Sequence, residues 1–494
     1  MTEALPVMKN ETYDVVFTDL TQEGAAVAKV DGYTLFVPGG LPGESARVQV
    51  VKTTKDYGYA KILERTETSP DRVAPPCPIF DTCGGCTIQH LSASAQLAFK
   101  RGVVQNALTR IGGLDASATA PTLGMSDPWA YRNKIQVPVA LQDGRLAFGF
   151  YRQRSHAIVP MAHCPITDPL IDAIVQAARQ IAEDNGIQPY DEQRHRGSLR
   201  HIMARVGKTS GEVMVVFVTK TDDLPFRKAF IDGLTSRYPQ IKSIVHNVNS
   251  RRTNAILGKK SRTIWGRDAI YDQIGGITFA ISAHSFYQVN PSQTEVLYKK
   301  ALEFAALTGS EIVIDAYCGI GTISLFLAKQ ARHVYGVEIV PEAIADAEAN
   351  ATRNHITNAT FEAGKAEDVI PAWRASGITA DVIVVDPPRK GCDAALLETM
   401  RAMQPQRIVY VSCNPATLAR DLKTLTADGL YQVTKIQPVD MFPQTTHVET
   451  VVLLSHKITV TNINVKFGEF EGKIPIKKIA EKYKPSERVT YVQR

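Results

Sequence analysis

Residues 311–324, EIVIDAYCGIGTIS, decide the fold of this chain. An apolar run ends at Asp315, two glycines follow at Gly319 and Gly321, and the next residues suit a helix. Glycines between a strand and a helix let the backbone turn tightly and approach a ligand closely. The stretch therefore predicts a strand–turn–helix unit of an α/β domain, with a ligand at the turn.

Further apolar runs of the same kind follow, as in VVDPPRKG (residues 384–391) and IVYVSCNP (residues 408–415). Helical patterns separate most of them, and we expect helices at residues 322–331, 341–355, 393–403 and 415–428. Strands that alternate with helices are typical of a parallel, doubly wound sheet. Residues 276–456 are therefore predicted to form a Rossmann-like α/β domain.

Acidic residues end two of the expected strands. Glu338 closes the strand after the glycine turn, where a carboxylate can accept hydrogen bonds from both hydroxyls of a ribose. Ser324 replaces the third glycine of the dinucleotide fingerprint, which favours S-adenosylmethionine over NAD because the former has no pyrophosphate to bind. Asp386 would face the same crevice. The alternative is a plain strand–helix turn with a glutamate at the surface.

A lone thiol, Cys413, ends the strand at residues 408–412, on the sheet edge that also carries Asp386. A thiol there suits a nucleophile, and a modest change from its ordinary pKa of about 8.5 would activate it. Glu449, in THVETVVLL, stands where the last strand begins and can act as a general base. The competing interpretations are a small buried cysteine and a solvated glutamate.

These groups fit methylation of uracil at C5. That carbon is a weak nucleophile until a thiolate adds to C6 and turns the ring into an enolate, and a base must then remove the C5 proton. Cys413 is the predicted nucleophile and Glu449 the predicted base.

Composition excludes several classes of protein. Hydrophobic residues make up 44% and charged residues 21% of the 494 residues, which is ordinary for a globular chain. No apolar run is long enough for a membrane helix and no secretory signal is visible, so we expect a cytoplasmic protein. The net charge is +6, but residues 457–494 hold nine basic and four acidic residues, so contacts with nucleic acid must come from local patches.

Seven cysteines, an odd number, favour metal binding or catalysis over a disulfide framework. Three of them lie in CPIFDTCGGC, as Cys77, Cys83 and Cys86, and Cys164 in MAHCPITD is a distant fourth. Four thiolates suit either zinc or an iron–sulfur cluster, and the spacing leaves both open.

The rest of the chain divides into three parts. Residues 1–68 show short apolar bursts separated by turn residues, which predicts a small OB-like β-barrel. Residues 69–275 hold the four cysteines named above and mix strands with helices, so an α+β domain is expected. Residues 457–494 form a basic tail to which no role is assigned.

Five motifs together resemble the RNA uracil-C5 methyltransferases: SAHSFYQVNPSQTEVLY, DAYCGIGTISL, VVDPPRKG, VSCNPATLARDL and HVETVVLL. The resemblance covers residues 1 to about 456. It is greater to the 23S ribosomal RNA branch than to the transfer RNA branch, because the barrel resembles a TRAM domain and the chain has the four cysteines.

The resemblance implies roles for particular residues. Cys413 would form the covalent adduct and Glu449 would resolve it. The residues expected to contact S-adenosylmethionine are Gln288, Tyr317, Glu338 and Asp386. The residues expected to hold a [4Fe–4S] cluster are Cys77, Cys83, Cys86 and Cys164. The partner would be 23S ribosomal RNA with a flipped uridine, with Arg132 and Lys134 as contacts, and no obligate protein partner or membrane is evident.

Four other functions stay open at this point. The first is a transfer RNA uracil-C5 methyltransferase. The second is a radical methylthiotransferase, which also combines a TRAM barrel, a cluster and S-adenosylmethionine, but needs Cys-x3-Cys-x2-Cys in a barrel enzyme domain. The third is an amino-group methylase, because DPPR resembles the Asp-Pro-Pro-Tyr loop of those enzymes. The last is an RNA-binding assembly factor without activity.

Overall fold

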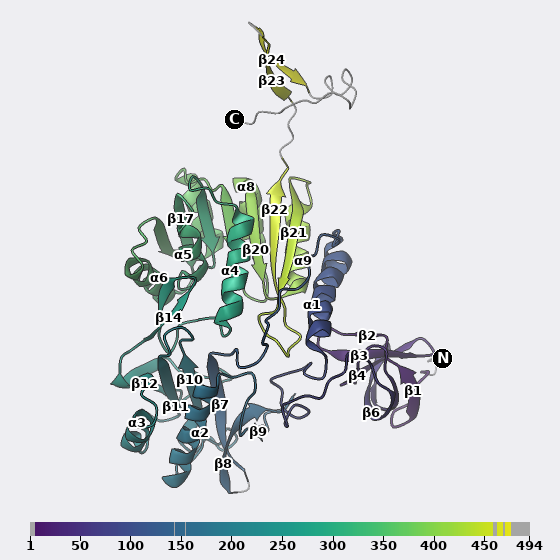
Figure 1. The fold of residues 1–494 in the computed structure, drawn as a ribbon, viewed down its shortest axis with the longest axis vertical. Helices are drawn as coiled ribbons and strands as arrows, with labels where there is room; N and C mark the ends of the chain where they lie inside the picture. The colour runs from purple at the N-terminus through teal and green to yellow at the C-terminus, as the bar shows by residue number, and fades with distance from the viewer. Residues whose placement is uncertain (1–4, 143, 154, 458–461, 468–469, 476–494) are drawn as a thin grey trace.

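The computed structural model describes residues 5–142, 144–153, 155–457, 462–467 and 470–475, so most of the basic tail lies outside the described residues. Figure 1 shows a small barrel beside a mixed sheet, and a larger α/β body above them. The strands β23 (Asn462–Phe467) and β24 (Phe470–Pro475) pair as a hairpin. Within the described part, no helix has the length and apolar character to cross a membrane.

The barrel is a six-stranded sheet with the order β1-β5-β6-β4-β3-β2. Its strands are β1 (Thr12–Val16), β2 (Asp19–Leu20), β3 (Ala25–Val30), β4 (Tyr33–Pro38), β5 (Ser45–Thr53) and β6 (Tyr57–Glu67). Along β4, Leu35 and Val37 are fully buried, whereas their neighbours in the strand are more exposed. Such alternation buries one face of each strand in the barrel core.

The middle of the chain folds as a seven-stranded mixed sheet with the order β13-β12-β11-β10-β7-β8-β9. Its strands are β7 (Lys134–Gln142), β8 (Arg145–Tyr151), β9 (Ile158–Pro160), β10 (Leu199–Val206), β11 (Val213–Thr219), β12 (Ile241–Val248) and β13 (Lys260–Gly266). Helices α2 (Pro169–Asp184) and α3 (Arg227–Thr235) cover one face of this sheet, where their apolar side chains share a core with the strands.

The α/β body holds a second seven-stranded sheet, with the order β18-β17-β16-β19-β20-β22-β21. Its strands are β16 (Ile312–Ala316), β17 (His333–Glu338), β18 (Ala359–Ala363), β19 (Val382–Val385), β20 (Arg407–Ser412), β21 (Tyr431–Val439) and β22 (Glu449–His456). The first five strands of that order run parallel, and β22 is antiparallel to both of its neighbours. The order reverses at β16, which places a ligand crevice beyond the carboxyl ends of β16 and β19.

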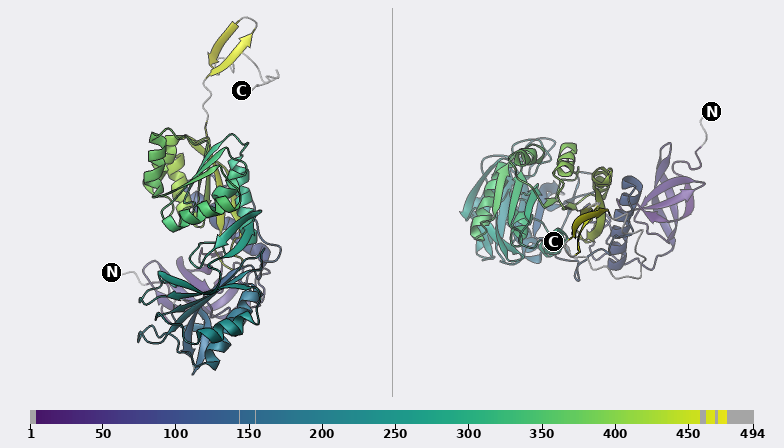
Figure 2. Two further views of the ribbon diagram at one scale, coloured as in Figure 1. Left: turned by 90° about the vertical axis from the view of Figure 1, so that its left-hand side faces the viewer. Right: turned by 90° about the horizontal axis from the view of Figure 1, so that it is seen from above.

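Helices cover both faces of this sheet, as Figure 2 also shows. On one face lie α4 (Pro291–Ala305), α5 (Thr322–Ala328) and α6 (Pro341–Arg353). On the other lie α7 (Ala366–Ala375), α8 (Ala394–Met403) and α9 (Pro415–Thr426). The residues of β16 alternate between the two cores, with Val313 in one and Ile314 in the other. This two-sided burial explains why the strands read as continuous apolar runs.

Several elements of this body were not expected from the sequence, among them α4, α7 and β21. Helix α7 contains Pro371, a residue that argues against a helix interior. Strand β21 lies at the edge of the sheet and alternates polar with apolar residues, so its pattern is weaker than that of a buried strand. Helix α4 begins at Pro291, and the Asn290 side chain caps it.

Two segments pack across the predicted boundaries. Helix α1 (Ala93–Ala107) and the π-helical turn after it (Leu108–Gly112) place Val104 and Leu108 in the core that α9 shares with β16. The hairpin of β14 (Ile270–Ile274) and β15 (Ile277–Ile281) likewise lies in the core of the α/β body. The boundaries at residues 68, 275 and 456 therefore stay predictions.

Candidate active site

A cavity of about 620 Å³ lies at the carboxyl ends of β16, β17, β19 and β20. The six predicted catalytic and donor-binding residues all line it: Gln288, Tyr317, Glu338, Asp386, Cys413 and Glu449. They come from the carboxyl ends of four parallel strands, from the start of β22 and from the loop before α4. The parallel strands bring their ends to one edge, which is the ordinary position of a ligand in an open α/β sheet.

The glycine turn forms one wall of this cavity. Gly321 adopts φ +81°, and a Cβ there would lie 3.2 Å from Cβ of Ala347 and 3.3 Å from Cζ of Phe361. Glycine is therefore required by both its backbone angle and its neighbours. Tyr317 has φ +69°, which is rare for a residue with a side chain and is often found at functional sites.

Glu338 is held by backbone amides at the same turn. Gly319 N donates to Glu338 Oε2 at 3.3 Å, and Val340 N donates to Oε1 at 3.0 Å. Each carboxylate oxygen can accept a further hydrogen bond. The position therefore suits recognition of a diol, as the sequence predicts.

Three carboxyl groups at the cavity have raised pKa values. Burial raises the pKa of Asp315 to about 7, against the hydrogen bond that Ser324 Oγ donates to Oδ2 at 2.5 Å. Burial also raises the pKa of Asp386 to about 7. Glu449 is 5% exposed, and burial together with the charge of Asp386 raises its pKa to about 8. With these pKa values, a substantial fraction of the three carboxyl groups is protonated near neutral pH.

The Cys413 thiol is half-buried, and its pKa differs from the expected one. Burial, followed by the negative charges of Glu449 and Asp386, raises the pKa of Cys413 to about 11. A modest change from the ordinary pKa therefore does not suffice to activate this thiol, because burial and two neighbouring carboxyl groups oppose its ionisation. A cation is needed nearby before the thiolate becomes common.

Strand register explains why Glu449 lies beside Cys413. Ser412 of β20 pairs with Thr450 of β22 in an antiparallel ladder. Cys413 follows the first residue of that pair and Glu449 precedes the second, so the two side chains follow at the same end of the ladder. An antiparallel β22 thus brings its first residue to the carboxyl edge of the parallel strands.

Arg389 is one of the basic residues that line the cavity, and sequence reasoning missed it. Its positive charge lowers the pKa of both Cys413 and Glu449, opposing the effect of burial. Its carbonyl accepts hydrogen bonds from Asn414 Nδ2 at 3.1 Å and Thr417 Oγ1 at 3.2 Å, which join the DPPRKG loop to the start of α9. The available signal was a basic residue directly after Asp-Pro-Pro.

Two aromatic residues at the cavity were also missed. Phe286 is 71% exposed and lies in the motif SAHSFYQVN, and Phe442 lies in the loop before β22. An exposed phenylalanine beside a cavity suits contact with a base. The exposure of Phe286 could not be derived from its apolar neighbours in the sequence.

The loop at residues 440–448, which carries Phe442 and leads into Glu449, is fixed by side chains from far away in the chain. Lys100 Nζ, on α1, donates to Asp440 Oδ1 at 2.5 Å and to Phe442 O at 3.1 Å. Gln293 Nε2 donates to Asp440 O at 3.0 Å. The position of Glu449 therefore depends on α1 and α4.

The four cysteines of the predicted cluster lie near one another, on two segments that are far apart in the chain. Cys86 and Cys164 share one apolar cluster with Tyr131. Burial raises the pKa of Cys86 to about 12, and the charges of Cys164, Cys83 and Cys77 raise it further. Within the described ranges no three His, Cys, Asp or Glu side chains are arranged to hold a metal ion. The set of donors suits a thiolate-bound centre, but the structure does not show one.

Arg132 and Lys134 lie next to the active-site cavity. Asn133, between them, donates from its backbone to Val289 O at 2.9 Å and from Nδ2 to Gln288 O at 3.0 Å. Burial lowers the pKa of Lys134 to about 8, and the charges of Arg205 and Arg132 add to the effect. A half-buried ammonium between two guanidinium groups suits an anionic ligand.

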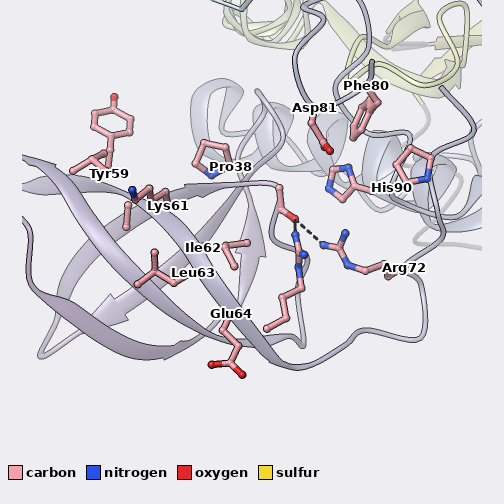
Figure 3. Close-up of a pocket in the computed structure, with 15 residues that line it drawn as sticks. Pro38, Tyr59, Lys61, Ile62, Leu63, Glu64, Arg72, Phe80, Asp81 and His90 are labelled. Atoms are coloured by element: carbon pink, nitrogen blue, oxygen red, sulfur yellow. Dashed lines mark hydrogen bonds between the residues drawn. The ribbon is translucent and has the colours of Figure 1, made fainter. Parts of the chain in front are cut away.

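A second cavity, of about 710 Å³, lies between the barrel and the cysteine-bearing segment (Figure 3). Arg65 and Arg72 both donate to Gly39 O, at 3.0 and 2.7 Å. Arg72 also pairs with the buried Glu44, and despite burial this contact keeps the pKa of Glu44 below its ordinary value. These groups hold the barrel against the segment that follows it.

The chain matches known families in two places. Residues 258–457 match the tRNA (uracil-5-)-methyltransferase family, and residues 6–63 match the TRAM domain. An RNA methyltransferase of Halalkalibacterium halodurans is 57% identical over 92% of this chain and 98% of its own length. The chain belongs to the S-adenosylmethionine-dependent RNA methyltransferases of the uracil-C5 family.

Other members of this RNA methyltransferase family are similar over nearly the whole chain. A Listeria innocua RNA methyltransferase is 54% identical over 92% of this chain and all of its own. The Pyrococcus abyssi tRNA (uracil-54, C5)-methyltransferase, solved with S-adenosyl-L-homocysteine, superposes with a TM-score of 0.72 at 29% identity, over 90% of this chain and all of its own. The predicted methyltransferase fold and the N-terminal TRAM barrel are confirmed.

The raised pKa values predict that this RNA methyltransferase is less stable in alkali. Asp315, Asp386 and Glu449 stay protonated when folded up to pH 7–8, but ionise near pH 4 when unfolded. The contribution of these protonated carboxyl groups to the stability of the folded state is complete below pH 4, and it is lost as the pH rises through 7–8. We expect the thermal midpoint to fall by a few degrees from pH 6 to pH 8.5, with a smaller fall in Asp315→Asn. Equal midpoints for the native chain would contradict this.

Proposed function

We propose that the enzyme transfers a methyl group from S-adenosylmethionine to C5 of a uridine in 23S ribosomal RNA, through a bond between Cys413 Sγ and C6 of the base. The observation that supports this is a single cavity lined by Cys413, Glu449 and the donor-binding residues. The choice of a ribosomal target depends on the combination of the barrel with the four cysteines.

The residues of the chain have distinct tasks in this reaction. Gln288, Tyr317, Glu338 and Asp386 would hold the donor, which when bound supplies a methyl group on a sulfonium cation. Cys413 adds to C6 of the flipped base, so that C5 becomes nucleophilic and accepts the methyl group. Glu449 then takes the proton from C5, and the Sγ–C6 bond breaks to release the product.

The charge of Arg389 influences the pH at which Cys413 and Glu449 reach the ionised forms that the reaction needs. Cys413 must act as thiolate and Glu449 as carboxylate, and their pKa values of about 11 and 8 predict that kcat/KM rises with pH between 6 and 9. Arg389→Met removes a charge that lowers both pKa values, so we expect kcat/KM at pH 7 to fall roughly tenfold, with part regained at pH 9. A loss that is equal at every pH would contradict a role through charge.

A transfer RNA target is the second candidate. The Pyrococcus abyssi tRNA (uracil-54, C5)-methyltransferase matches 90% of this chain, so the barrel alone does not separate the two substrates. The deciding experiment incubates the enzyme with labelled donor and either 23S RNA fragments or total transfer RNA, and maps the methylated base by mass. Methylation of transfer RNA alone would replace the ribosomal proposal.

The fold argues against a radical methylthiotransferase. That reaction needs a barrel enzyme domain, whereas the donor cavity here lies on an open seven-stranded sheet. The amino-group alternative needs no thiol and is tested by substitution of Cys413.

We further propose that Cys77, Cys83, Cys86 and Cys164 hold a [4Fe–4S] cluster. Their spacing and their convergence from two segments support this assignment. Thr87 N and Ile88 N, directly after Cys86, donate to Gln444 O at 3.0 and 3.2 Å. A centre here would therefore stabilise the loop at residues 440–448 and take no part in methyl transfer. Iron and sulfide analysis with an absorption spectrum of anaerobically purified protein tests it, and zinc at one ion per chain would overturn it.

A further inference from the structure

A third cavity, of about 1020 Å³, lies on the central sheet, on the face opposite α2. Gln136, Pro138 and Ala140 of β7 line it, whereas Ile135 and Val137 point into the core that α2 covers. Alternate residues of a strand face opposite sides of a sheet. The cavity is therefore an open concave surface of the middle body, and the reaction described above makes no use of it.

A buried cation lies against this cavity. Arg200 is 4% exposed, and its Nη1 donates to the carbonyls of Asn249 and Arg251, both at 2.7 Å. Its guanidinium lies 4.3 Å from the ring centroid of Tyr190. In the described part of the chain its Nε has no hydrogen-bond partner and no carboxylate pairs with it. A buried charge without a counter-ion is costly, so an anion fits here.

The rim adds an aromatic ring and further basic groups. Tyr151 is 39% exposed, and its ring lies 5.5 Å from that of His156. Arg194 and Arg196 lie at the same rim and are exposed. Two acids are also present: Asp191 lies 3.8 Å from Arg194, and Glu192 lies 3.4 Å from His156. Arg196 and Arg200 have no such acidic partner among the described residues.

The strand that lines the third cavity, β7, begins beside the active site. Lys134 stands two residues before Gln136 on β7, and therefore on the same face of the sheet. The preceding residue, Asn133, holds the backbone of Gln288 at the donor cavity. The start of β7 therefore lies beside the donor cavity, and the rest of the strand leads from there to the third cavity.

We propose that this cavity binds an unpaired nucleotide of the RNA substrate, with a backbone phosphate against Arg200 and Arg196 and the base on the ring of Tyr151. This rests on the proposed function, which makes RNA the substrate. Guanidinium groups that contact phosphate and aromatic rings that stack on bases are the usual means of binding single strands. The site would act on RNA outside the target uridine and so contribute to the choice of substrate.

The test compares full-length variants in their binding to a fluorescein-labelled, 20-nucleotide single-stranded RNA of mixed sequence. We expect Arg196→Gln/Tyr151→Leu to weaken binding about fivefold or more, and to reduce the slope of log Kd against log salt by about 0.7. Lys228→Gln, on α3 at the other face of the sheet, is the matched control and should keep both values. A duplex of the same sequence should show a smaller effect of the double variant.

Three results would overturn the proposal: unchanged affinity and salt slope in the double variant, an equal loss in the Lys228→Gln control, or an equal loss for the duplex. Circular dichroism of each variant establishes that it is folded, and Arg196→Gln alone, at an exposed side chain, provides a variant that leaves the core intact. The proposed function is tested separately, by measuring whether the unmodified enzyme forms a covalent adduct with RNA that contains 5-fluorouridine. If that adduct is missing but the salt effect is present, the reaction is refuted and the RNA-binding cavity is supported.

Discussion

Cys413→Ala is expected to lower kcat for uracil methylation by at least about 10⁴-fold, because removal of a covalent nucleophile leaves only binding and positioning. The same variant should form no stable adduct with RNA that contains 5-fluorouridine. In the native enzyme the fluorine at C5 cannot leave as a proton does, so the bond between Sγ and C6 stays. Peptide mapping of the trapped complex should place the RNA on residue 413.

Cys392→Ala is the matched control. Cys392 is 5% exposed, its thiol lies near Tyr410 and Asp421, and it is not among the residues that line the donor cavity. It should retain both the adduct and the activity. Full activity in Cys413→Ala would instead support an amino-group methylase, which requires no thiol.

Lys100→Met is expected to destabilise the folded chain by about 3–5 kcal/mol, because it leaves Asp440 buried without its partner. The two side chains are 0% and 5% exposed, and they join α1 to the loop before β22 over 340 residues of sequence. Thermal or urea unfolding would measure the loss. Since the loop leads into Glu449, activity should fall at temperatures where the variant is still folded.

Two further variants serve as controls for Lys100→Met. Lys100→Met/Asp440→Leu replaces the pair with apolar groups and should recover much of the stability. Lys299→Met breaks an exposed pair with Glu295, so it should cost no more than about 1 kcal/mol. A Lys100→Met protein as stable as the native chain would show that the ion pair does not hold the loop.

The sequence allowed the α/β body to be predicted because its signals are local. The central strands β16, β19 and β20 are buried on both faces, so their residues form continuous apolar runs, and Asp315, Asp386 and Cys413 mark where these three runs end. Helix α7, by contrast, contains a proline, and the edge strand β21 is partly polar. Those elements are stabilised by packing against the rest of the sheet, which local pattern does not reveal.

The sequence by itself thus determined which chemical groups lie at the carboxyl edge of the sheet, since the ends of parallel strands must share that edge. Only the tertiary structure decided how those groups affect one another. The antiparallel pairing of β22 with β20 brings Glu449 to the end of the ladder that Cys413 follows, and Arg389 acts on both. Burial, charge and pKa depend on distances between residues far apart in the chain, and a one-dimensional pattern does not contain those distances.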